Sequence, residues 1–200
     1  MNLKEMLTED ARLLLEPGYL PVETGYFRLP DGDMQVRCLT RMPRCKGKML
    51  DWWFGHMSVE TYQMWEPEHH QSLQWDDKWS PGHYIGASQI AHEYVGTRLM
   101  EMKATFLDPS EFFDISKFKA ARVGAAICIQ FNTNNVPHSY SIFFVRDTDY
   151  GCELRQWVRL YHGTDAAASE MMGHGITGMG NLADLLPDLY AKHNPDKKKS

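Results

Sequence analysis

The 200-residue chain is poor in cysteine and lacks the short patterns that identify several enzyme classes from sequence alone. Its four cysteines form neither a CxxC pair nor a short disulfide framework, which is typical of reduced thiols in a cytoplasmic protein. There is no GxSxG nucleophile elbow and no phosphate-binding loop. The sequence therefore gives no support to a disulfide-rich secreted domain, a serine hydrolase with a nucleophile elbow or a P-loop enzyme.

Long hydrophobic runs and excess positive charge are also absent. No segment approaches the roughly 18 consecutive apolar residues that a membrane-spanning helix needs, and the first residues lack the apolar stretch of a signal peptide. The net charge is −5, and the one basic run is Lys197–Lys199. We therefore expect a cytoplasmic protein with neither a nucleic-acid nor a membrane partner.

Aromatic residues and histidines, in contrast, are concentrated between residues 51 and 93. Five of the six tryptophans and five of the nine histidines fall in this stretch, with carboxylates among them. Apolar rings beside imidazoles and carboxylates are typical of a small-molecule pocket with a polar or metal-binding floor. An unusually aromatic core would give the same composition, so both interpretations stay open.

The hydrophobic periodicity predicts an α+β domain. A curved antiparallel sheet grips one long C-terminal helix and encloses a cavity in this architecture. We expect helix–hairpin residues 1–47 to pack on a core domain of residues 48–192, followed by a disordered tail at 193–200. The predicted helices cover 3–15, 58–65 and 166–192, a hairpin joins 26–29 to 34–39, and strand-like runs cover 84–94, 97–106, 124–131, 139–146 and 152–161.

Two of these segments raise questions that the sequence leaves open. The run 152–161 alternates, and we expect its arginines, Arg155 and Arg159, to face solvent. The C-terminal helix contains four glycines between residues 173 and 180, each less favourable than alanine by about 0.8–1 kcal/mol in a helix. Either close approach to the sheet or a ligand compensates for them, or the segment is a loop and the helix begins near Asn181.

Five blocks of residues, in order, resemble the 2,4-diacetylphloroglucinol hydrolase family, to which phloretin hydrolases also belong. The resemblance covers roughly residues 48–191. The blocks are Tyr62-x-x-Trp65-x-Pro67-x-x-His70, His92-Glu93-Tyr94-Val95-Gly96, Val145-Arg146-Asp147-Thr148, Gly151-Cys152-Glu153-Leu154-Arg155 and His174-x4-Met179-x-Asn181-Leu182-Ala183-x-Leu185-Leu186-Pro187-x-Leu189-Tyr190.

The resemblance implies a Bet v 1-like helix-grip fold around a zinc ion (Zn2+). It implies a hydrolase that cleaves the carbon–carbon bond between an acyl group and a polyphenol ring in a retro-Claisen reaction. His70, Glu93 and His174 match the metal ligands, and the catalytic water would be bound to their zinc. The fourth ligand position falls on Gly178, which has no side chain, and Glu170, one turn earlier on the same helix face, is the candidate replacement.

For substrate binding, the resemblance points to Tyr62, with Tyr140 as a second candidate. Each assignment has a structural alternative: a surface or core role for His70 and His174, solvent exposure for Glu93, and ordinary core packing for Tyr62. His92 and Glu93 are adjacent on a strand, so only one of them can face a pocket.

The function expected from the sequence is thus a zinc-dependent carbon–carbon hydrolase acting on an acylated polyphenol or aromatic polyketide. Two alternatives stay open. One is a metal-free helix-grip protein that binds such a ligand, and the other is a cyclase or isomerase acting on it. The sequence does not determine the substrate or the oligomeric state, for which a homodimer is one option.

Overall fold

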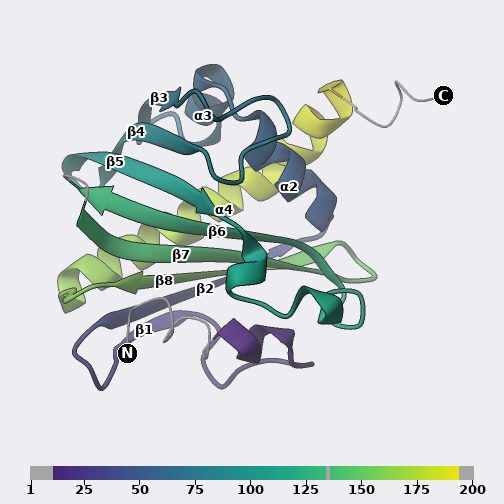
Figure 1. The fold of residues 1–200 in the computed structure, drawn as a ribbon, viewed down its shortest axis with the longest axis horizontal. Helices are drawn as coiled ribbons and strands as arrows, with labels where there is room; N and C mark the ends of the chain where they lie inside the picture. The colour runs from purple at the N-terminus through teal and green to yellow at the C-terminus, as the bar shows by residue number, and fades with distance from the viewer. Residues whose placement is uncertain (1–10, 134–135, 194–200) are drawn as a thin grey trace.

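The computed structural model describes residues 11–133 and 136–193 and shows one eight-stranded antiparallel sheet with a long helix across one face (Figure 1). The strand order is β1-β2-β8-β7-β6-β5-β4-β3. The strands are β1 (Gly25–Arg28), β2 (Met34–Met42), β3 (His70–Trp75), β4 (Ser88–Val95), β5 (Arg98–Leu107), β6 (Val123–Thr133), β7 (Val136–Asp147) and β8 (Cys152–Leu160).

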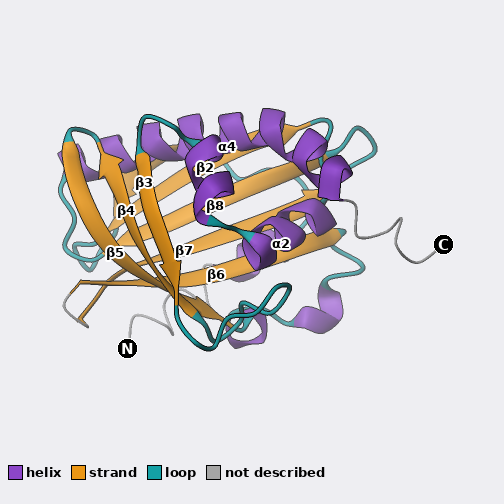
Figure 2. Ribbon diagram, turned by 90° about the horizontal axis from the view of Figure 1, so that it is seen from above, coloured by secondary structure: helices purple, strands orange, loops and turns teal. Residues whose placement is uncertain are grey.

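The helices α2 (Gly47–His56), α3 (Val59–Trp65) and α4 (Asp165–His193) lie on the same side of the sheet (Figure 2). Short 3-10 helices are η1 (Arg12–Leu15), η2 (Pro109–Glu111) and η3 (Ile115–Lys117). The sheet curves around α4, and register shifts in β3 and β6 mark bulges, which bend strands. The predicted α+β helix-grip architecture is confirmed.

Local sequence explains where two of the helices begin. The Ser58 hydroxyl accepts a hydrogen bond from the Thr61 amide, and the Thr61 hydroxyl accepts one from the Ser58 amide, so a capping box starts α3. At α4, the Thr164 hydroxyl accepts from the Ala167 amide at 3.1 Å. The long helix therefore begins ahead of all four glycines, and the alternative start near Asn181 is wrong.

The main hydrophobic core fills the space between the sheet and the three helices. It combines aromatic side chains of α2 and α3, such as Trp53 and Tyr62, with Leu182 and Leu186 of α4. A second core lies on the convex face of the sheet, where Ala11 and Leu14 pack against residues that include Trp157 of β8. The sheet is therefore covered on both faces near its middle.

This second layer corrects the expectation for β8. Arg155 and Arg159 are 2% and 1% exposed, not in solvent. The Arg155 guanidinium donates to Glu23 at 2.9 Å, and that of Arg159 donates to Asp33 at 2.8 Å. The prediction failed because strand alternation identifies a face but does not show what covers it. Here residues N-terminal to β2 supply both the cover and the carboxylates.

The hairpin, α3 and the five later strands appear where the sequence predicted them, with boundaries shifted by a few residues. Helix α2 and strand β3 were not predicted. The expected helix at 3–15 falls mostly on residues outside the described part, and so does nearly all of the expected tail at 193–200. β2 pairs with β8 along its whole length, which places the hairpin in the same sheet as the later strands. Among the described residues, no helix is both long and apolar enough to cross a membrane.

Candidate metal centre and cavity

The turn between α3 and β3 places an acid and a histidine beside each other. Pro67 cannot continue α3, so the helix ends at Trp65. The backbone amides of His69 and His70 then donate to the Glu66 carbonyl at 3.0 and 2.8 Å. This turn buries both Glu66 and His70, each 2% exposed.

Strand pairing brings a second acid to the same place. His70 lies opposite Glu93 in the register of β3 and β4. Glu93 points inward, and its carboxylate lies 3.4 Å from Nε2 of His70. The neighbouring His92 points to the other face, where it contacts Ser72 and Glu101. As predicted from strand alternation, only one of the two adjacent residues faces the interior.

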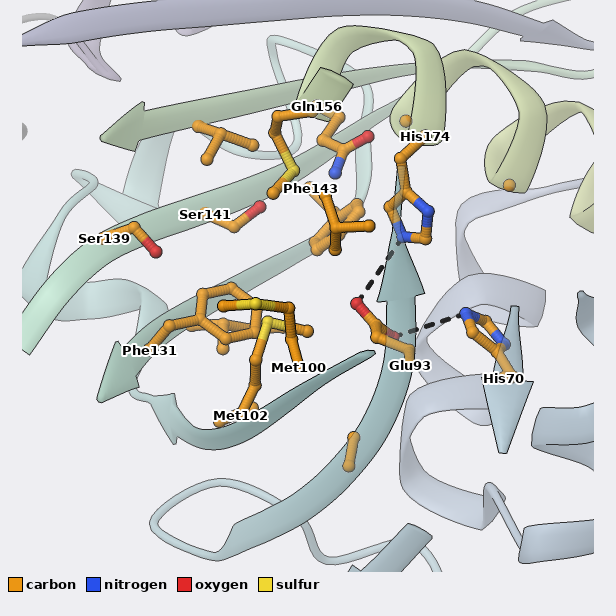
Figure 3. A pocket seen from close by; sticks show the side chains of 18 of the residues that line it. His70, Glu93, Met100, Met102, Phe131, Ser139, Ser141, Phe143, Gln156 and His174 are labelled. Atoms are coloured by element: carbon orange, nitrogen blue, oxygen red, sulfur yellow. Dashed lines mark ion pairs between the residues drawn. The ribbon is translucent and has the colours of Figure 1, made fainter. Parts of the chain in front are cut away.

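Helix α4 contributes the fourth group, His174, from above the sheet. Its Nε2 atom lies 3.6 Å from Oε1 of Glu93, and its Nδ1 atom lies 3.4 Å from Oε2 of Glu66. Figure 3 shows His174 and His70 on either side of the Glu93 carboxylate. The cluster thus unites α4, the end of α3 and two adjacent strands.

Tyr62 fixes two members of this cluster. Its ring stacks on the His70 imidazole with centroids 3.8 Å apart, and its hydroxyl donates to Oε2 of Glu93. Its backbone carbonyl lies 2.9 Å from Nδ1 of His70. Because a carbonyl can only accept, Nδ1 carries the proton in neutral His70. The Nε2 lone pair therefore points toward the two carboxylates.

Within the described part of the chain, the cluster has an excess of hydrogen-bond acceptors and no lysine or arginine partner. Neither oxygen of Glu66 has a hydrogen-bond partner among the described residues. Burial and the neighbouring Glu93 raise the pKa of Glu66 to about 7, and burial raises the pKa of Glu93 as well. Burial lowers the pKa of both His70 and His174 to about 4, so the imidazoles are neutral at pH 7. Buried carboxylates facing unprotonated nitrogens favour a bound cation at their centre.

The donor spacing fits a small divalent ion. In a tetrahedral zinc site with bonds of about 2.0–2.1 Å, neighbouring donor atoms lie about 3.3–3.4 Å apart. Oε2 of Glu66 is 3.4 Å from Nε2 of His70 and 3.4 Å from Nδ1 of His174. Glu93 lies 3.4 Å from Nε2 of His70 through Oε2, and its Oε1 lies 3.6 Å from Nε2, the other ring nitrogen of His174. The donor atoms of Glu66, His70 and His174 all lie within 4.8 Å of one another. Two imidazoles and two carboxylates are a donor set that zinc accepts.

Three members of the cluster, His70, Glu93 and His174, line a cavity of about 210 Å³ between the sheet and α4. Apolar side chains of β5 and β6, including Met100, Met102 and Phe131, form much of its lining (Figure 3). Ser141 of β7 and Gln156 of β8 are polar exceptions. Such a cavity suits a small, mostly apolar molecule with a few polar groups.

Three further residues singled out from the sequence lie as follows. Tyr62 lines the cavity, but its hydroxyl is engaged with Glu93. Tyr140 does not fit its expected substrate contact, because it points to the convex side, packs in the second core and donates to Gln130. Its neighbours Ser139 and Ser141 line the cavity instead, as strand alternation requires. Glu170 contacts Arg98 at 3.3 Å and is not the acid beside the histidines.

Glu66 was missed in the sequence analysis, although it lies inside the Tyr62–His70 block. Glu66 lies close to Gly178, the helix position at which the family resemblance predicts a carboxylate. A Cβ atom built at Gly178 would lie 3.5 Å from Oε1 of Glu66, and the Trp65 indole donates to the Gly178 carbonyl at 2.6 Å. Glu66 therefore occupies space next to the helix position expected to carry an acid. The sequence did contain a signal for it, because Glu66 lies four residues before the candidate ligand His70.

Comparisons with known proteins show the family of this chain. A family model described as the DAPG hydrolase PhiG domain matches residues 6–166. The chain is 27% identical to the 2,4-diacetylphloroglucinol hydrolase of a Pseudomonas species, over 95% of this chain and 79% of that protein. It is 26% identical to the phloretin hydrolase of Eubacterium ramulus, over 84% of this chain and 71% of that protein.

Among solved structures, the major latex-like protein 151 of Panax ginseng superposes with a TM-score of 0.55 at 10% identity. This superposition covers 77% of this chain and 97% of the ginseng protein. At that identity the likeness concerns the fold, which is the Bet v 1-like helix-grip fold expected from the sequence resemblance.

The fold and the buried donor cluster together define a helix-grip protein whose cavity holds a candidate metal centre. Within that class, the chain belongs to the DAPG hydrolase PhiG domain family. His70 and Glu93 lie within the matched residues, whereas His174 lies beyond them on α4.

Proposed function

We propose that this protein is a zinc-dependent hydrolase that cleaves the carbon–carbon bond between an acyl group and a polyphenol ring. The supporting observation is the convergence of two neutral imidazoles and two buried carboxylates, with contacts of 3.4–3.6 Å, of which His70, Glu93 and His174 line an apolar cavity. The names of the relatives supply the substrate class, since they are hydrolases of diacetylphloroglucinol and phloretin.

In this proposal His70, Glu93 and His174 hold the zinc ion, and Glu66 supplies the fourth donor in place of a side chain at Gly178. Bound zinc would polarise the acyl carbonyl and make water more acidic. Tyr62 positions His70 through its ring and carbonyl and Glu93 through its hydroxyl. Such supporting contacts orient metal ligands and set the histidine tautomer.

The reaction consumes one water. Its oxygen adds to the acyl carbonyl carbon and remains in the carboxylic acid product. The bond to the ring carbon breaks, and that carbon keeps the electron pair and takes a proton. Of the two protons of the water, one ends on the ring carbon and the other on the carboxylic acid product, so the step balances without any other reactant. Ring hydroxyls stabilise the leaving carbanion through the keto tautomer.

The first test is metal content and acid release. Wild-type protein, purified without added metal and then supplied with zinc, is compared with His174→Ala by elemental analysis and by acid release from acylphloroglucinols. We expect about one zinc per chain in the wild type, and in the variant far less bound zinc and a rate of acid release lowered by about 10³-fold. His92→Ala is the matched control, because His92 neighbours Glu93 but faces away from the cluster.

Two outcomes would contradict the proposal. If the wild type takes up no zinc, the protein is instead a metal-free binder of aromatic ligands. If zinc binds but a ligand changes its spectrum without changing its mass, the protein is a cyclase or isomerase.

A further inference from the structure

The cavity contains a second set of buried polar atoms, separate from the metal cluster. Among the described residues, four cavity-lining side chains carry a buried atom without a hydrogen-bond partner. They are Oε1 of Gln89, Nε2 of His138, Oγ of Ser141 and Oε1 of Gln156. Buried polar atoms are normally paired, so unpaired ones inside a cavity indicate where a ligand's polar groups belong.

Two of these residues are neighbours on the sheet. Ser141 of β7 lies opposite Val158 of β8, and Gln156 of β8 lies opposite Phe143 of β7. They are therefore a diagonal pair, with Cα atoms about 7–8 Å apart. Both face the cavity (Figure 3) and are almost fully buried, at 1% and 6% exposure. A single small ring could reach both side chains.

Helix α4 is shaped to accommodate Gln156. A Cβ atom built at Gly175 would lie 2.5 Å from Oε1 of Gln156, a separation that real side chains do not adopt. Glycine is unfavourable inside a helix, and here it leaves the space that the carboxamide occupies. Because Gly175 directly follows His174, this space also places Gln156 beside the metal cluster.

The chemistry of the pair selects the ligand. An amide oxygen accepts a hydrogen bond, and a serine hydroxyl donates or accepts one. The surrounding wall is apolar, with Met100, Met102 and Phe131 on the neighbouring strands. Arg98 and Glu170 also line the cavity, and they pair with each other. Neutral hydroxyl or keto oxygens on a flat apolar ring match this environment better than a charged ligand does.

We propose that Ser141 and Gln156 are specificity-determining residues that recognise ring oxygens of the polyphenol, next to the acyl group at the metal centre. This assignment deepens the proposed function and rests on it for the identity of the ring. It gives a reason for glycine at position 175 of α4, because any larger residue there would displace the Gln156 carboxamide. It also predicts that the ring is recognised through its hydroxyl groups even when no metal is bound.

The test is binding of a ring without an acyl group to metal-free protein. The affinities for 1,3,5-trihydroxybenzene and 1,3,5-trimethoxybenzene are measured by calorimetry for the wild type, Gln156→Leu and Ser141→Ala. We expect the wild type to prefer the hydroxylated ring. Each substitution should weaken that binding about tenfold, the effect of one lost hydrogen bond, and reduce the preference for hydroxyl over methoxyl groups.

Three further variants, two of them controls, distinguish a loss of ring recognition from a loss of folding. Gln35→Leu removes a buried glutamine from the same sheet but outside the cavity lining and should leave ring binding unchanged. Gly175→Ala should displace the carboxamide and lower hydroxyl preference as Gln156→Leu does. Gly173→Ala, on the exposed side of α4 with nothing near its Cβ position, should behave as the wild type. Thermal melting checks that each variant is folded.

Unchanged discrimination in folded Gln156→Leu and Ser141→Ala would overturn the assignment, as would a wild type that does not distinguish the two rings. In either case we would infer that Ser141 and Gln156 form hydrogen bonds with water and not with the ring. The readout needs neither metal nor turnover. Failure to take up zinc or to release acid would therefore count against the proposed function and leave this result standing.

Discussion

The two faces of the sheet bury charge in different ways. On the convex face, Arg155 meets Glu23, and Arg159 meets Asp31 and Asp33, so each buried guanidinium has a carboxylate. On the concave face, the ion-pair partners of Glu66 and Glu93 among the described residues are all imidazoles, and burial lowers the pKa of two of them, His70 and His174, to about 4. The convex charges are balanced within the chain, and those of the concave face are not.

This difference distinguishes buried charges that stabilise the fold from buried charges that are available to bind a ligand. A buried ion pair whose partners satisfy each other holds segments together, here the N-terminal residues and β8. Buried acids without a cation raise the free energy of the folded protein unless a ligand binds. A substitution on the convex face should therefore change stability, whereas one on the concave face should change ligand binding.

The largest expected effect is on the concave face. Removing one metal ligand with His174→Ala should lower the rate of acid release by about 10³-fold, because metal polarisation contributes several kcal/mol to transition-state stabilisation. Steady-state kinetics with saturating zinc would measure this. Unfolding of the metal-free variant should match that of the wild type within about 1 kcal/mol. Near-normal turnover in His174→Ala would contradict the claim that the concave face carries the charges that serve catalysis.

The convex face should show the reverse pattern. Arg159→Met leaves Asp33, only 4% exposed on its side chain, without its cation, and should lower the free energy of unfolding by roughly 3–5 kcal/mol. Turnover per folded molecule should not change. Urea denaturation would measure the loss, and Arg159→Met combined with Asp33→Asn should recover part of it. A loss of turnover without a loss of stability would mean that the convex pair serves the site.

Glu66→Gln should have effects of opposite sign in the two ligation states. Without metal it removes an unbalanced buried charge and should stabilise the protein by about 1–3 kcal/mol at pH 8. The gain should shrink at pH 5, where Glu66, with its pKa raised to about 7, is already protonated in the folded state. With zinc the same substitution should weaken binding at least tenfold. Thermal melting and chelator competition would measure the two effects.

The variant Glu66→Gln/Gly178→Glu refines this test, because the Cβ position at 178 is free of close contacts, the nearest atom lying 3.5 Å away. A carboxylate returned to the helix should restore zinc affinity if Glu66 compensates for the glycine. Zinc affinity that is the same in the wild type and in Glu66→Gln would show that Glu66 is not a ligand.

The smallest expected effect concerns a glycine of α4 that contacts neither face of the sheet. Gly173→Ala should raise the free energy of unfolding by about 0.5–1 kcal/mol, because alanine favours the helix and no atom lies within 4 Å of the new Cβ. Turnover and zinc affinity should remain unchanged. Denaturation curves measure the gain, and a loss of activity would show that the exposed side of α4 also contributes to function.

Much of the architecture could be predicted because its signals are local. The helix predicted at 58–65 is α3, which begins at a capping box of Ser58 and Thr61 and ends before Pro67. Strand-like runs at 124–131 and 139–146 located β6 and β7. Helix α2 and strand β3 were missed because residues 47–56 cluster their aromatic residues without a helical period, and residues 70–75 contain only two apolar residues, Leu73 and Trp75. Their structure depends on packing against α4 and β4.

For the site, the sequence by itself was enough to predict three metal ligands, His70 and Glu93 in two aromatic-rich blocks and His174 on a helix. Only the tertiary structure decided that Glu66 joins them, that Tyr140 faces the other way and that Glu170 pairs with Arg98. The physical reason is that residue type and spacing are properties of one segment. Donor convergence and charge balance, in contrast, depend on how α3, α4, β3 and β4 meet, and on which residues cover the far face of the sheet.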